Sequence, residues 1–66
     1  MNFHEFTREE FESIKQKAML NEELSKIFEL KIKGYFAYQI AMELNISESS
    51  VNRRIRQLKS KIMKVI

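Results

Sequence analysis

The side chains best suited to hydrogen-bonding chemistry lie close together between Ser49 and Lys59. An arginine can bond O6 and N7 of a guanine, and an asparagine can bond N6 and N7 of an adenine. Serine hydroxyls, lysine ammonium groups and the N–H groups at a helix N-terminus suit phosphate oxygens instead. On residue type we therefore predict base contacts from Asn52, Arg53 and Arg56, and phosphate contacts from Ser49, Ser50 and Lys59.

Other chemistries find little support in the residue types. The chain has no cysteine, which excludes disulfides, thiolate metal ligands and thiol catalysis. Its single histidine, His4, lies near the N-terminus without other metal-ligating residue types at a suitable spacing. The acidic group Glu9, Glu10 and Glu12 is typical of the first turn of a helix. No nucleophile–base pair or glycine-rich phosphate loop is present, so we expect neither an enzyme nor a cofactor.

Charge is divided unevenly along the chain. Residues 1–30 hold four basic and seven acidic side chains, a net charge of 4 − 7 = −3. Residues 31–66 hold eight basic and two acidic side chains, a net charge of 8 − 2 = +6. A one-sided basic field attracts a phosphate backbone or an acidic membrane surface, although a lysine-rich face can also be merely solvated.

Composition indicates a single all-α domain of 66 residues. Proline is absent and Gly34 is the one glycine, so few residues can interrupt helices. The N-terminus has no apolar stretch of the kind found in signal peptides, and the longest uncharged run, residues 34–42, is too short to cross a membrane. We expect a cytoplasmic protein without a membrane partner.

Capping signals divide the chain into four predicted helices, at about 8–19, 21–33, 36–44 and 48–63. Thr7 with Glu10 forms a capping-box pattern, and Asn21 and Ser47 are candidate N-caps. Gly34 suits the left-handed residue that ends a helix. Because Asn21 is the weaker boundary, the first two helices could be one bent helix. Residues 1–20 would form an acidic N-terminal helix, and residues 21–66 a three-helix core.

Apolar residues at helical spacing predict the core faces of these helices. The predicted inward stripes are Phe11, Ile14 and Ala18; Leu24, Ile27, Phe28 and the stem of Lys31; Ala37, Ile40, Ala41 and Leu44; and Val51, Ile55, Leu58 and Ile62. We also place Phe36 in the core and Ile46 in the turn as a core plug. The apolar end formed by Met63, Val65 and Ile66 could fray, cover the core or supply a dimer contact, and we favour the dimer contact.

Helices 36–44 and 48–63, joined by a three-residue turn, have the helix-turn-helix arrangement. The segment from Leu24 to Ile62 resembles the DNA-binding domain of LuxR-type regulators, and sigma-factor region four shares the same three-helix core. The matching positions are Gly34, Ile40, Ala41, Leu44, Ile46, Ser47, Glu48, Val51 and Asn52. Phe36 stands where that family usually has a serine or threonine cap. Small regulators of bacteriophages and mobile elements are also similar.

The resemblance implies a role for individual residues. Base-reading positions of the family fall on Asn52, Arg53 and Arg56, and its phosphate contacts fall near Tyr38, Ser49 and Ser50. Arg54 projects toward the flank, where it could touch the DNA backbone or pair with an acid.

Two functions follow as expectations. The first is a transcriptional regulator that inserts helix 48–63 into the major groove of duplex DNA, with a homodimer expected on a two-part site. The alternative is a sigma-like adaptor that binds a transcription-machinery protein through its acidic N-terminal helix, with Phe3 and Phe6 beside it.

Overall fold

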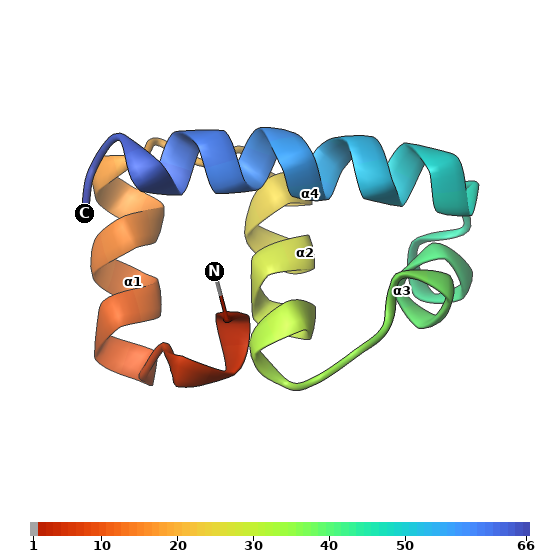
Figure 1. Cartoon of the computed structure of the whole chain (residues 1–66), viewed down its shortest axis with the longest axis horizontal. Helices are drawn as coiled ribbons and strands as arrows, with labels where there is room; N and C mark the ends of the chain where they lie inside the picture. Colours follow the sequence, from red (N-terminus) through yellow and green to blue (C-terminus); the bar gives the residue numbers. More distant parts are fainter. Residues whose placement is uncertain (1) are drawn as a thin grey trace.

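The computed structural model describes residues 2–66, and these residues form an all-α domain. Its elements are a short 3-10 helix η1 (Phe3–Glu5) and the helices α1 (Arg8–Lys17), α2 (Glu22–Ile32), α3 (Ala37–Leu44) and α4 (Glu48–Met63). The predicted fold class is thereby confirmed, and η1 is an element that the sequence did not predict. Figure 1 shows α4 running along the top of the domain, over the upper ends of α1 and α2 and above α3. It packs chiefly against α3 and α2.

The predicted caps form as expected. The Glu10 N–H donates to Thr7 Oγ1 at 3.1 Å, and the Thr7 N–H donates back to Glu10 Oε1 at 2.8 Å, which completes the capping box. The N–H of Leu24 donates to Asn21 Oδ1 at 2.8 Å. These side chains satisfy backbone donors that have no partner inside the helix, so each fixes the start of one helix.

Three residues with left-handed backbones separate the helices. Gly34 ends α2 with φ of 94°, and Asn45 ends α3 with φ of 57°. Met19 adopts φ of 52° between α1 and α2, so these are two separate helices and not one bent helix. Gly34 is also a point of close approach, because a Cβ added there would lie 3.1 Å from His4 Cε1.

The centre of the core is an aromatic cluster around Phe28, which is fully buried. Its ring meets the rings of Phe3, Phe6 and Phe11 edge-on, with centroids 5.9, 5.5 and 5.0 Å away. Phe3 is only 5% exposed, so it is a core residue and not part of an exposed docking surface. Through this cluster η1 and α1 are joined to α2, which in turn supports α4.

Most of the predicted core stripes are buried. In α4 this holds for Val51, Leu58 and Ile62, while Ile55 is half-buried at the edge of the core. Ile40 and Ala41 are the buried residues of α3, and Ile46 packs against the core from the turn.

The placement of Phe36 in the core was wrong, because 63% of this residue is exposed. Phe36 is the N-cap of α3 and precedes the first helical turn, so its side chain does not follow the inward stripe of the helix. The ring stacks on that of Tyr38 instead, with centroids 6.0 Å apart and planes 8° from parallel. Its N–H donates to Gln39 Oε1 at 2.8 Å, which is half of a capping box.

The apolar C-terminal end is divided between core and surface. Val65 packs against the core, whereas Met63 and Ile66 are 64% and 69% exposed. The expectation of a dimer contact here stays a prediction.

A cluster of charges joins α1 to α2 around Glu29. Arg8 Nη1 lies 3.3 Å from Glu29 Oε2, and Lys26 Nζ lies 3.7 Å from Glu29 Oε1. Burial opposes ionisation of this carboxyl, but the hydrogen bond from Arg8 and the charges of Lys33, Lys26 and Arg8 outweigh it. The pKa of Glu29 therefore lies below its ordinary value.

We predict that this cluster makes stability depend on pH. Because the pKa of Glu29 is lower in the folded chain, its ionised form stabilises the fold above the unfolded pKa of about 4.3. That contribution is lost as the pH falls through the folded pKa. Glu29→Gln should lower the free energy of unfolding by about 0.2–1 kcal/mol at neutral pH, and the difference from wild type should vanish in acid. Urea denaturation at both pH values measures this, with Glu5→Gln as the control, because Glu5 is exposed and lies outside the four α-helices.

Candidate nucleic-acid interface

The position of α4 leaves one of its flanks open to solvent. Its core face is covered by α2 and α3, as described above. Asn52, Arg56 and Lys59 are exposed and follow one another at spacings of four and three, so they lie along one flank of the helix. With 16 residues α4 is about 24 Å long at 1.5 Å per residue, which is enough to lie along a groove.

The first turn of α4 is organised by serine hydroxyls. Ser47 Oγ accepts from the Ser50 N–H at 3.1 Å and lies 2.9 Å from Ser50 Oγ. Arg53 Nη2 donates to Ser50 Oγ at 3.3 Å, so the predicted base contact and the predicted phosphate contact touch each other. Ser49 is exposed and takes no part in these bonds. The structure thus brings Ser50 and Arg53 together at the N-terminal end of the flank.

Arg54 lies apart from this group. Its Nε forms an ion pair with Glu23 Oε1 at the start of α2, and both side chains are about two-fifths exposed, 39% and 40%. A phosphate contact from Arg54 would have to compete with this ion pair. The pairing with an acid, which was the alternative expectation for Arg54, is the arrangement that the structure contains.

Tyr38 lies on the first turn of α3 and is 53% exposed. Its ring is held against that of Phe36, so the two aromatic side chains form a small plate at the N-terminal end of the helix. Tyr38 is a residue of α3, and α3 packs on α4. Tyr38 therefore stands on the helix next to the one that carries the other predicted contacts.

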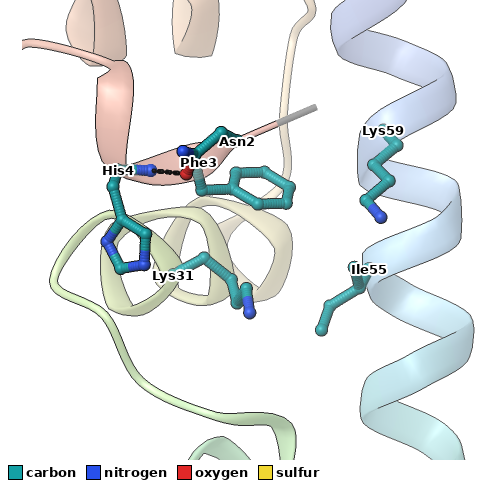
Figure 2. A pocket seen from close by; sticks show the side chains of 6 residues that line it. All are labelled: Asn2, Phe3, His4, Lys31, Ile55 and Lys59. Carbon is teal, nitrogen blue, oxygen red and sulfur yellow. Dashed lines mark hydrogen bonds between the residues drawn. The ribbon is translucent and has the colours of Figure 1, made fainter.

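One pocket beside α4 contains a lysine that the sequence reading did not assign to the site. The pocket has a volume of about 240 Å³ and is lined by Asn2, Phe3, His4, Lys31, Ile55 and Lys59. Figure 2 shows Lys31 on α2 and Lys59 on α4 extending toward the gap between the two helices. Lys31 was considered only as an apolar stem in the stripe of α2. Its place at the end of that stripe, one turn after Phe28, indicated a position at the edge of the core, but no local pattern indicated that α4 would lie beside it.

The described residues also bear on two other kinds of feature, a metal site and a membrane-spanning helix. Within residues 2–66, the histidine and the glutamates do not gather in any group of three that could hold a metal ion. Over the same residues, none of the helices has the length and apolar character needed to span a membrane. What the surface beside α4 offers is an array of cationic and amide hydrogen-bond donors.

Comparisons with known proteins gave no match, either to a protein family, to a curated protein or to a solved structure. The resemblance to LuxR-type and sigma region-four domains therefore stays a prediction, supported by the sequence positions given above.

Proposed function

We propose that the protein is a DNA-binding transcriptional regulator that places α4 in the major groove of duplex DNA. The observation that carries the proposal is the exposed basic flank of α4. Arg53, Arg56 and Lys59 are exposed on or beside this flank, and from Asn52 to Met63 the helix contains no carboxylate. A phosphate-rich groove would meet donors all along this surface and no like charge.

The proposed contacts fall into two groups, those to base edges and those to the DNA backbone. In the proposal, Asn52, Arg53 and Arg56 reach base edges, because residues near the N-terminal end of a recognition helix come closest to the floor of the groove. Ser49, Ser50, Lys59 and Tyr38 bond the backbone and set the orientation of α4. Arg54 would contact the backbone through its Nη groups, because its Nε is bonded to Glu23.

The test is fluorescence anisotropy against a pool of random duplexes at two salt concentrations, with the bound fraction sequenced. We expect binding that weakens steeply with salt, and an enriched sequence motif in the bound fraction. A palindromic motif would indicate that two copies bind together. Failure to bind duplex DNA even at low salt would contradict the proposal. The double variant Arg53→Gln/Arg56→Gln serves as the control that should lose the enrichment.

The adaptor alternative has less support from the contacts of α1. Glu10 is occupied by the capping box, and Glu12 pairs with Lys15 at 3.2 Å and with Arg8 at 3.6 Å. Phe3, which was expected to help such docking, is buried. Two of the three glutamates of α1 are thus engaged in contacts within the domain. A pull-down of transcription-machinery proteins that survives high salt without DNA would restore this alternative.

A further inference from the structure

The pocket beside α4 is basic on two opposite sides. Lys31 extends from α2 and Lys59 from α4, and Ile55, one turn before Lys59 on α4, points toward the same gap. The third side is formed by Phe3 and His4 of η1 and by Asn2, the N-cap of η1. None of the residues that line the pocket is acidic. Two ammonium groups around one small pocket without a carboxylate create a local positive potential that an anion would relieve.

Neither lysine is engaged by a carboxylate within the described chain. Lys31 Nζ lies 3.4 Å from the carbonyl oxygen of Tyr35 and 5.9 Å from the centroid of the Phe3 ring. Among residues 2–66, the ion pairs with nitrogen–oxygen distances up to 4.0 Å include neither Lys31 nor Lys59. Lys31 is half-buried, so its charge is held at this place more firmly than that of a fully exposed lysine.

The η1 side of the pocket is also fixed in position. Phe3 is buried against Phe28, which anchors η1 to α2. The His4 ring lies directly over Gly34, and the His4 N–H donates to Asn2 Oδ1 at 3.1 Å, as the dashed line in Figure 2 shows. That bond uses the acceptor of the Asn2 side chain and leaves its NH₂ group able to donate. The pocket is therefore built from three elements that are packed together.

We propose that this pocket binds a phosphate group, with Lys31 and Lys59 as its principal donors. A tetrahedral phosphate presents oxygens in several directions, which suits donors that approach from opposite sides. The phosphate could belong to a DNA backbone or to a free phosphate compound. The DNA source rests on the proposed function: Lys59 continues the flank that carries Asn52 and Arg56, so a duplex lying along this flank brings one strand to the pocket. DNA contact would then extend beyond α3 and α4 to α2 and η1.

The first arm of the test measures DNA binding by fluorescence anisotropy over a range of salt concentrations. Lys31→Gln removes the charge but keeps much of the half-buried stem. If a backbone phosphate occupies the pocket, this variant should bind about fivefold more weakly at physiological salt, and the salt slope should fall by about 0.9. Lys31→Arg should restore most of the loss. Lys17→Gln is the charge-matched control, because it removes one lysine charge away from the pocket. Lys17 is the last residue of α1 and precedes the start of α2, whereas Lys31 lies near the C-terminal end of α2.

The second arm measures backbone amide shifts during a titration with inorganic pyrophosphate. A free phosphate compound in the pocket should shift the amides of Phe3, His4, Ile55 and Lys59 in the wild type, and Lys31→Gln should abolish these shifts. This arm needs no DNA, so it decides the inference even if the protein binds no duplex and the proposed function fails.

The two arms distinguish a DNA phosphate from a free phosphate compound. A selective loss for Lys31→Gln in the first arm supports a DNA phosphate, and selective shifts in the second arm support a free phosphate compound. If Lys31→Gln binds DNA as Lys17→Gln does, and pyrophosphate leaves the four amides unchanged, the inference is overturned. In that case an enriched sequence motif in the wild type that is lost in the Arg53→Gln/Arg56→Gln variant would leave the proposed function standing.

Discussion

Replacing Phe28 by alanine should leave the chain largely unfolded at room temperature. Removing a fully buried phenylalanine side chain costs about 3–5 kcal/mol, and a single core in a domain this small rarely supplies more than about 3–5 kcal/mol in total. Phe28 is 0% exposed and holds three other aromatic rings edge-on, so neighbouring side chains cannot fill the space without leaving their own contacts. Circular dichroism and urea denaturation of the variant measure the effect.

Phe36→Ala is the matched control for this prediction. It removes the same side chain from a position that is 63% exposed and whose ring stacks only on Tyr38. Its free energy of unfolding should stay within about 0.5 kcal/mol of the wild type. Phe28→Leu should fall between the two, since it keeps part of the buried volume. If Phe28→Ala unfolded at the same urea concentration as the wild type, the aromatic cluster would not be the centre of the core.

The helices could be predicted because their signals are local. Thr7 with Glu10, Asn21, Ser47 and Gly34 each act on backbone groups within a few residues, and all of them behave as predicted. The bounds were correct to within two residues, and the last helix was predicted at the residues it occupies. Periodicity was equally informative for α4, because a long amphipathic helix repeats its pattern several times.

The features that sequence could not predict depend on contacts between distant residues. Phe3 is buried because its ring meets Phe28, twenty-five positions away, and without that contact a three-residue helix such as η1 has little stability of its own. Hydrophobicity alone predicts Phe36 in the core, but its place before the first turn of α3 directs it to the surface. Lys31 and Lys59 share a pocket because α4 crosses α2, which no local pattern records.

For the candidate site, sequence predicted the flank but not all of its internal contacts. Asn52, Arg56 and Lys59 are exposed along α4, as their spacing indicated. The ion pair from Arg54 to Glu23 and the bond from Arg53 to Ser50 depend on side-chain positions that only the folded chain defines. The ion pair makes Arg54 less available to DNA than Arg53, because the guanidinium of Arg54 is already bonded to an acid.

The second large effect is expected at Arg56, in the discrimination between a selected site and random DNA. Arg56 is exposed on the open flank and forms no ion pair within residues 2–66. If it bonds a base edge with both arms of its guanidinium, Arg56→Ala should lose about 1–3 kcal/mol of discrimination, roughly 5- to 150-fold in affinity for the selected site. Binding to random duplexes should weaken much less, by the few-fold that one lost charge implies.

Arg56→Lys separates base reading from charge. Lysine keeps the positive charge but lacks the planar fork, so this variant should bind random DNA like the wild type and still lose discrimination. Lys59→Ala is the contrasting variant, since a phosphate contact should weaken both DNAs alike and lower the salt slope by about one. Equal losses on selected and random DNA for Arg56→Ala, recovered in full by Arg56→Lys, would assign Arg56 to the phosphate backbone. Base reading would then depend on Asn52 and Arg53 at the N-terminal end of α4, where the bond to Ser50 occupies one of the five N–H donors of Arg53.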